Sequence, residues 1–286
     1  MSDDDKGAVV ITGSSTGIGQ ACALHLDKLG FRVFAGVRKE TDGEVLKSKS
    51  SNRLKTIFVD VTDSESIQRA SETVAGAIGD SRLAGLVNNA GISINAPLEF
   101  LPINLLQKQF DVNVTGQIAV TQTFLPMLRA AKGRIVFIGS TSGRLAIPMG
   151  GPYCASKFAI EALTDSLRME LKPWGIEVAV VQPGAIDTPI WEKSLAAGDA
   201  LLGSLPPRMM ELYAPLIDKV ISGAKNSAKG AVSPQCVAGA VAHALTATKP
   251  KTRYLVGKDA RVQMLLTYLP DRWRDSLIMK LIDKAI

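Results

Sequence analysis

The sequence lacks the features that mark exported and membrane-spanning proteins. No stretch approaches the ~18 uninterrupted apolar residues that a membrane-spanning helix requires. The first six residues carry three Asp where a secretory signal would be basic. Only three cysteines are present, spaced far apart at Cys22, Cys154 and Cys236, and this odd number favours a reducing compartment over a disulfide framework. We therefore expect a cytoplasmic protein without a transmembrane segment.

Histidine is scarce too, which bears on two kinds of site. The only two histidines, His25 and His243, stand near no cysteine or acidic pair at metal-ligand spacing. A zinc site or a Ser-His-Asp triad would therefore lack parts. We expect no bound metal, and we expect both histidines to lie on helix faces without a chemical role.

The excess of positive charge is concentrated at one end of the chain. The formal net charge is +6, and residues 249–286 hold nine Lys or Arg residues against four acidic ones. Charges of mixed sign in a helical tail are more typical of a solvated face than of a phosphate-binding stripe. We therefore expect no nucleic-acid partner.

Short apolar runs alternate with longer amphipathic segments along most of the chain. Buried strands that alternate with helices form a parallel sheet covered on both faces, because right-handed crossovers place helices on both sides. The predicted fold class is therefore α/β, a doubly wound and mostly parallel sheet of the Rossmann type, in one domain over residues 1–257. The predicted strands are Ala8–Ile11, Arg32–Gly36, Leu54–Val59, Leu83–Val87, Arg134–Ile138, Glu177–Val181 and Arg253–Val256.

Two segments depart from this alternation. Residues 186–230 contain four prolines, and we interpret them as an excursion above the carboxyl ends of the strands that forms a substrate lid. Residues 258–286 are predicted to form a helical C-terminal extension, with helix over Arg261–Ile286. An apolar stripe on this helix would pack on the body or on a partner subunit, or would attach peripherally to a membrane surface. Its members are Trp273, Leu277, Ile278, Leu281 and Ile282.

A glycine-rich loop follows the first predicted strand and opens a helix predicted over Gln20–Leu29. In this context Gly13 permits a tight turn, Gly17 lets the backbone approach a pyrophosphate, and Gly19 lets the helix pack close to the sheet. The free N–H groups at the helix start would attract the anion. The loop therefore predicts a dinucleotide site, with a purely structural turn as the alternative. It comprises Thr12, Gly13, Ser14, Ser15, Thr16, Gly17, Ile18 and Gly19.

The end of the second strand indicates the type of cofactor. An acidic residue there would bind the ribose 2′-hydroxyl of NAD, whereas an arginine suits the 2′-phosphate of NADP. Arg38 stands at this end and no Asp or Glu does, so we expect NADP(H), with NAD(H) as the alternative if Arg38 is only a solvated surface residue.

Two further strand ends carry weaker signals for the cofactor. Asp60, followed by Val61, comes after the third strand, and its carboxylate could accept a hydrogen bond from an adenine amino group. The small residues Asn89, Ala90 and Gly91 follow the fourth strand and would let the cofactor pass close to the backbone.

A tyrosine and a lysine four residues apart occur twice. Tyr254 and Lys258 lie in a predicted strand, where four residues span ~13 Å and the side chains cannot cooperate. Tyr153 and Lys157 lie at the start of a helix predicted over Ser156–Leu171, where side chains four residues apart share a face. One ammonium at ~4 Å, in an effective dielectric of ~20, could lower a phenol pKa of ~10 by ~2–3 units. We therefore expect Tyr153 to act as a base at neutral pH.

Two polar residues are expected beside this pair. Ser140 follows the fifth strand, where its hydroxyl can polarise the carbonyl oxygen that Tyr153 protonates, although a turn serine without a chemical role is the alternative. Asn113 falls in a helical segment predicted over Leu105–Gln117. An interior Asn is unusual there unless it holds a water or a backbone group beside Lys157.

Together these residues resemble the single-domain group of the short-chain dehydrogenase/reductase family over about residues 7–257. The resemblance implies that Tyr153 is the general acid/base and Ser140 the carbonyl polariser. It also implies that Lys157 binds the cofactor ribose and tunes Tyr153, and that Asn113 holds a proton-relay water. The motifs that carry the resemblance, in the family's order, are TGSSTGIG, NNAG at 88–91, Asn113, Ser140, YCASK at 153–157 and PGAIDT at 183–188. In the last motif, the residues implied to hold the nicotinamide carboxamide are Pro183, Gly184, Ile186 and Thr188.

Within the family, residues 143–171 and the C-terminal extension look most like hydroxysteroid and retinol dehydrogenases. This resemblance implies an oxidoreductase that transfers a hydride between NADP(H) or NAD(H) and an apolar alcohol or ketone of the steroid or retinoid kind. It also implies a homodimer or homotetramer. A catalytically silent NAD(P)-binding regulator or scaffold is the alternative from another class. The lid residues that suit an apolar substrate are Trp191, Leu195, Leu201, Leu202, Leu205 and Leu212.

Overall fold

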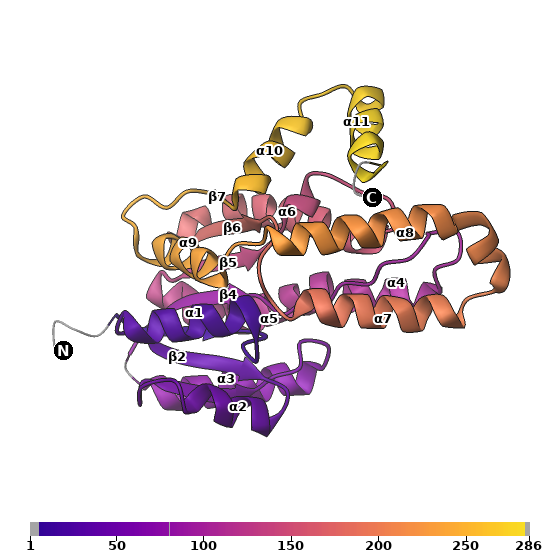
Figure 1. Ribbon diagram of the computed structural model, residues 1–286. Helices are drawn as coiled ribbons and strands as arrows, with labels where there is room; N and C mark the ends of the chain where they lie inside the picture. Colours follow the sequence, from indigo (N-terminus) through magenta and orange to yellow (C-terminus); the bar gives the residue numbers. More distant parts are fainter. Residues whose placement is uncertain (1–5, 80, 284–286) are drawn as a thin grey trace.

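The computed structural model describes residues 6–79 and 81–283 and contains a seven-stranded parallel sheet (Figure 1). The strand order is β3-β2-β1-β4-β5-β6-β7, so the winding direction reverses between β1 and β4. This confirms the predicted doubly wound α/β fold. All seven predicted strand starts agree, and four predicted ends differ by one or two residues. The strands are β1 (Ala8–Ile11), β2 (Arg32–Val37), β3 (Leu54–Phe58), β4 (Leu83–Asn88), β5 (Arg134–Ile138), β6 (Glu177–Pro183) and β7 (Arg253–Val256).

Helices cover both faces of the sheet, which explains why the strands are apolar on both sides. Each face has its own hydrophobic core layer. One layer is closed by α1 (Gly17–Lys28), α2 (Glu40–Lys47) and α9 (Pro234–Thr246). The other is closed by α3 (Ser64–Ile78), α5 (Gly116–Ala131) and α6 (Gly151–Leu171). Because all strands run the same way, their carboxyl ends form one edge, where ligands bind in such sheets.

The segment with Asn113 is more irregular than the predicted single helix. Helix α4 (Ile103–Phe110) leads into a π-helical turn over Asp111–Thr115, which continues directly into α5. Such turns insert one extra residue into a helix and are frequent at functional sites. The turn holds Asn113 fully buried.

The predicted lid consists of two long helices, α7 (Ile190–Ser204) and α8 (Pro207–Lys229). They run antiparallel and project away from the sheet (Figure 1). The chain turns between them at Leu205 and Pro206, and Pro207 occupies the first turn of α8, where its missing N–H costs nothing. Helix α8 buries Met209 and Ile217 against Met149, which precedes α6. The excursion is therefore anchored to the body by a small apolar cluster of its own.

The C-terminal extension is helical, as predicted, and forms two helices, α10 (Lys258–Leu266) and α11 (Asp271–Asp283). Pro270 separates them, since proline lacks the N–H and its ring clashes with the preceding turn. The apolar stripe is also divided. Ile278 is buried and α11 packs against α8, whereas Trp273 and Leu281 are 71% and 55% exposed. Residues 1–5 of the predicted domain and 284–286 of the predicted extension lie outside the described residues.

Two further properties concern the whole described chain. None of the helices in the described residues is long and apolar enough to cross a lipid bilayer. Within residues 6–79 and 81–283, no group of three His, Cys, Asp or Glu side chains is arranged to hold a metal ion. Both histidines lie on helices, His25 on α1 and His243 on α9, and the ring of His243 is hydrogen-bonded to the Tyr254 hydroxyl at 2.9 Å.

Candidate active site

Helix α6 brings the predicted tyrosine and lysine together at the carboxyl edge of the sheet. The helix begins at Gly151, five residues earlier than predicted, with Pro152 in its first turn. Tyr153 and Lys157 therefore lie on one helical face, and the Lys157 ammonium is 5.7 Å from the centre of the Tyr153 ring. The Ser140 hydroxyl, just beyond β5, is hydrogen-bonded to the Tyr153 side chain. Three of the predicted catalytic residues thus form one group.

Ser140 is fixed by the turn that follows it. Its hydroxyl accepts a hydrogen bond from the backbone N–H of Ser142 at 3.1 Å and caps a short 3-10 turn over Thr141–Gly143. Serine is suited to this position because its side-chain oxygen reaches a free N–H two residues ahead. The same oxygen remains within hydrogen-bonding reach of Tyr153.

The pKa values of the pair differ from the expectation. Burial raises the pKa of Tyr153 to about 12, and the hydrogen bond from Ser140 offsets only part of this rise, although the ring keeps some solvent-accessible surface. Burial lowers the pKa of Lys157 to about 8, opposed by the negative charge of Glu161. The prediction that the pKa of Tyr153 is lowered is therefore wrong. Transfer of the Tyr153 phenolate out of water costs more free energy than the hydrogen bond from Ser140 restores.

Lys157 is held in a defined position next to Tyr153. Its ammonium group donates a hydrogen bond to the backbone carbonyl of Ile138, the last residue of β5, at 2.7 Å, and the side chain is buried. An ammonium has three N–H donors. Two remain available for hydroxyl groups of a ligand.

Asn113 connects the π-helical turn to two neighbouring segments. Its amide oxygen accepts from the N–H of Ile92 at 2.8 Å, and its amide nitrogen donates to the Ile92 carbonyl at 2.9 Å and to the Ser156 hydroxyl at 3.1 Å. Ser156 precedes Lys157, so Asn113 holds a backbone group and a neighbour of Lys157. Both amide hydrogens are used in this way. A relay water would therefore have to be held by the main chain of the turn.

The glycine loop has the close contacts that its sequence predicts. Gly13 adopts φ +66°, and a Cβ there would lie 2.9 Å from the Cα of Ala90. A Cβ on Gly19 would collide with the carbonyl of Gly13, so only glycine lets α1 start this close to the strand end. Thr16 precedes α1 without a side-chain cap among the described residues. The N–H groups of the first turn thus point toward the loop without a capping partner, which fits a dinucleotide phosphate.

Thr12 and Asn89 fasten the glycine loop to the end of β4. The Thr12 hydroxyl accepts from the N–H groups of Asn89 and Ala90, both at 3.0 Å, and the Asn89 amide donates to the carbonyls of Thr12 and Gly13, both at 2.9 Å. The motif around Asn89 is therefore a clamp as well as a candidate binding surface. Sequence reasoning assigned no role to Thr12, and its place at the end of the first strand was the available signal.

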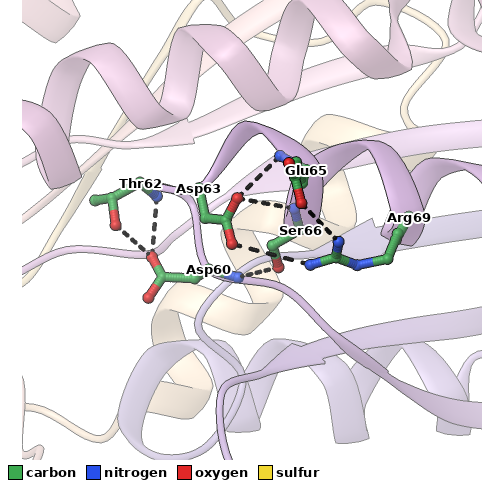
Figure 2. Close-up of polar contacts among 6 residues, drawn as sticks. All are labelled: Asp60, Thr62, Asp63, Glu65, Ser66 and Arg69. Atoms are coloured by element: carbon green, nitrogen blue, oxygen red, sulfur yellow. Dashed lines mark hydrogen bonds and ion pairs between the residues drawn. The ribbon is translucent and has the colours of Figure 1, made fainter.

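The two candidates for the adenosine side of the cofactor lie close enough to interact. Arg38 is exposed just beyond β2. The pKa of Asp60 lies below its usual value, chiefly because the carboxylate accepts a hydrogen bond from the backbone N–H of Thr62. Burial acts in the opposite direction, and the charge of Arg38 contributes a smaller lowering. Figure 2 shows that one Asp60 oxygen accepts both the N–H and the hydroxyl of Thr62, at 2.9 and 2.7 Å. The other oxygen is directed away from these bonds.

Asp63 and Ser66 fix the start of α3 beside Asp60. The Asp63 carboxylate accepts from the N–H groups of Glu65 and Ser66, which is an N-cap, and the N–H of Asp60 donates to the Ser66 hydroxyl at 2.9 Å (Figure 2). These bonds give Asp60 and the following Val61, which is buried, a fixed backbone at the end of β3.

The segment predicted to hold the nicotinamide carboxamide is tied to the C-terminal extension. The N–H of Ala185 donates to the Asp259 carboxylate at 2.8 Å, and Gly184 leaves no room for a Cβ beside that carboxylate. Farther along, the Trp191 indole donates to the carbonyl of Ile186 at 2.7 Å, and Thr188 lies against Gly17. Pro183 ends β6. Sequence reasoning missed Asp259, because its partner stands 74 residues earlier.

The second tyrosine and lysine pair lies outside this group. Tyr254 is on β7, and its hydroxyl accepts from the N–H of Lys251 at 2.9 Å besides contacting His243. Lys258 begins α10. Context therefore separates the two copies as the sequence indicated.

The chain matches the family model described as short chain dehydrogenase over residues 7–198. It is 36% identical to human dehydrogenase/reductase SDR family member 9 over 280 residues, covering 95% of this chain and 87% of the relative. It is 38% identical to mouse retinol dehydrogenase 5 over 277 residues, covering 94% and 87%. It is 37% identical to the NADPH-dependent 3-dehydrocapnine reductase of Ornithobacterium rhinotracheale over 278 residues, covering 95% of both chains.

A solved structure has the same architecture. The short-chain dehydrogenase of Streptomyces avermitilis superposes with a TM-score of 0.76 at 26% identity, covering 99% of this chain and 97% of that one. The family model, the relatives and this fold agree with one another. The chain therefore belongs to the short-chain dehydrogenase family of NAD(P)-dependent oxidoreductases.

Proposed function

We propose that this protein transfers a hydride between NADP(H) and an apolar alcohol or ketone, with Tyr153 as the general acid/base. The observation that carries the proposal is the grouping of Ser140, Tyr153 and Lys157 at the carboxyl edge of the sheet. The nicotinamide, when bound, supplies or accepts the hydride. The protein provides orientation, hydrogen bonds and one mobile proton.

In the reducing direction Tyr153 donates its phenolic proton to the substrate oxygen, and the Ser140 hydroxyl donates a hydrogen bond to the same oxygen. A pKa of about 12 keeps Tyr153 protonated at neutral pH, which is the form that reduction requires. The buried Lys157 ammonium stabilises the phenolate that remains and offers its two free N–H groups to the cofactor ribose. Asn113 joins the π-helical turn to the Ile92 backbone and to the Ser156 hydroxyl, and so helps to hold the residue before Lys157 in place.

The loop from Gly13 to Gly19 is the proposed pyrophosphate site, with Ser15, Thr16, Gly17 and Ile18 supplying backbone and hydroxyl groups. Arg38 supports a preference for NADP(H) over NAD(H), because it is exposed just beyond β2 and residues 32–39 contain no Asp or Glu. The NADPH dependence of a bacterial relative agrees with this preference. Asp60, Val61, Asn89, Ala90 and Gly91 are proposed for the adenosine side, and Pro183, Gly184, Ile186 and Thr188 for the carboxamide.

The lid supports an apolar substrate of the steroid or retinoid kind. Helix α7 contains no fully buried residue, so its apolar side chains, among them Trp191, Leu195 and Leu202, keep surface available for a ligand. Leu201 and Leu205 are likewise half-buried, and Leu212 on α8 is exposed. A relative named retinol dehydrogenase agrees with this substrate class.

Assembly and location are proposed on exposed surfaces. Helix α6 exposes Phe158 and Met169, which supports a homodimer or homotetramer formed through this helix. Trp273 and Leu281, with the basic residues of the extension, support peripheral contact with a membrane surface. The described cysteines are all unpaired, which agrees with a reducing compartment such as the cytoplasm.

The test is turnover of a panel of apolar alcohols and ketones by the wild-type protein and by Tyr153→Phe. We expect the variant to lose most of kcat while the Kd for NADPH stays the same, because only the proton donor is removed. Unchanged kcat would reject the role of Tyr153. Binding of NADPH by the wild-type protein without turnover of any panel member would support the silent regulator instead.

A further inference from the structure

A buried carboxylate lies one helical turn beyond Lys157. Glu161 on α6 is 5% exposed. One oxygen accepts from the Gln182 amide on β6 at 2.8 Å, and the other accepts from the Arg253 guanidinium on β7 at 2.9 Å. A buried carboxylate is costly unless it is paired and hydrogen-bonded in this way. The three side chains therefore hold an ionised Glu161 in one place.

Glu161 also packs against the turn that carries Ser140. A Cβ on Gly139 would lie 3.4 Å from a Glu161 carboxylate oxygen. A Cβ on Gly143 would lie 3.1 Å from the Glu161 Cγ and 2.9 Å from the Lys157 carbonyl. Because Gly139 and Gly143 have no side chains, the turn can pack directly against Glu161. The Glu161 side chain therefore supports the position of Ser140.

The polar and charged groups around Lys157 come from four elements. On its own helix these are Tyr153 and Glu161, and from β7 the nearest is Arg253. The Arg253 guanidinium donates hydrogen bonds to the carboxylates of Glu161 and, at 2.6 Å, of Asp165. The end of β5 supplies the neutral Ile138 carbonyl, and β6 the neutral Gln182. Within the described part of the chain, Glu161 is the charge that opposes the effect of burial on the pKa of Lys157.

We propose that Glu161 is a positioning residue, which keeps Lys157 in its charged form and supports the turn of Ser140 while Gln182 and Arg253 hold it in place. This inference rests on the proposed hydride transfer. It extends the residues on which the reaction depends from the carboxyl edge of the sheet to the ion pair between Glu161 on α6 and Arg253 on β7.

The test variant is Glu161→Gln, which keeps the shape and removes the charge. We measure kcat/KM for ketone reduction against pH. Removal of the negative charge one helical turn from Lys157 is expected to move the alkaline limb down by about one pH unit, the order of size of a nearby charge at an effective dielectric of about 20. The control is Asp165→Asn, which removes the other acid bound to Arg253 but lies two turns from Lys157. Its profile is expected to match the wild type. An unmoved limb in folded Glu161→Gln overturns the proposal.

A second variant and a second measurement cover failures of folding or turnover. If Glu161→Gln does not fold, Glu161→Gln with Arg253→Gln removes both members of the ion pair, which is usually tolerated better than removal of one. A smaller downward shift is expected, because the positive charge of Arg253 is removed as well. The Lys157 side chain is also titrated directly by NMR of labelled lysine, with its signal assigned through Lys157→Met. A wild type without turnover rejects the proposed function, whereas an identical Lys157 titration in wild type and variant rejects the role of Glu161.

Discussion

The Asp259 carboxylate accepts a hydrogen bond from the backbone N–H of Ala185 at 2.8 Å. Asp259 lies in the first turn of α10, whereas Ala185 lies in the segment proposed to hold the nicotinamide carboxamide. The start of the C-terminal extension is thus part of the frame of the site, although the sequence suggested a boundary at residue 257.

Asp259→Ala is expected to raise the Kd for NADPH several-fold and to lower the free energy of unfolding by about 1.5–3 kcal/mol, the usual worth of a hydrogen bond to a charged group. Fluorescence titration and chemical denaturation measure the two effects. Asp275→Ala is the control, because among the residues that the structure describes Asp275 on α11 forms only an exposed contact with Arg274 at 3.8 Å. Equal Kd values for both variants would show that Asp259 does not fix the segment.

Arg38→Asp is expected to reverse the cofactor preference. The substitution replaces an attraction to the 2′-phosphate with a repulsion, and kcat/KM for NADPH relative to NADH should fall by at least about tenfold to a hundredfold, given ~1.5–3 kcal/mol for a charge-assisted hydrogen bond. Lys47→Asp makes the same change of net charge at an exposed position at the end of α2. A ratio that moves equally in both variants would assign the effect to net charge alone.

Gly19→Ala is expected to abolish cofactor binding and to destabilise the fold, because the added Cβ meets the Gly13 carbonyl. Gly76→Ala is the matched control, since it lies within α3 with open space around it. Alanine there should stabilise the helix by roughly 0.5–1 kcal/mol. Thermal denaturation and NADPH titration distinguish the two, and normal binding by Gly19→Ala would refute the close approach.

Lys157→Met is expected to inactivate the enzyme while stabilising the fold near neutral pH. The pKa of Lys157 falls from 10.5 to about 8 on folding, so the buried charge costs stability below pH 8. The unfolded chain binds more protons between about pH 8 and 10.5, so this cost is relieved as the pH rises through that window. The gain should be about 1–3 kcal/mol at pH 7, after the lost bond to Ile138, and should vanish near pH 10.5.

Urea denaturation of Lys157→Met at pH 7, 9 and 10.5 measures this dependence. Lys172→Met, at an exposed position after α6, is the control and should show no such trend. A gain that is constant with pH would point to packing rather than to the buried charge.

The sequence predicted the parts of the site that depend on local spacing. Tyr153 and Lys157 share a helical face because they stand four residues apart, and Ser140 approaches them because the ends of parallel strands share one edge.

The rest depends on contacts between distant residues. Glu161 and Arg253 are 92 residues apart, and nothing in either local pattern indicates the other. The pKa values of Tyr153 and Lys157 depend on how deeply the packed protein buries them, which spacing along a helix does not reveal. Asn113 likewise acquires its partners, Ile92 and Ser156, only through tertiary packing.

The contact between Gly17 and Thr188 joins the phosphate loop to the root of α7, which begins two residues later. A displacement of the glycine loop, for example on cofactor binding, should therefore also displace the start of α7 in the proposed substrate lid. Thermodynamic linkage makes such an effect mutual, so the dinucleotide and the substrate should change each other's affinity by the same factor.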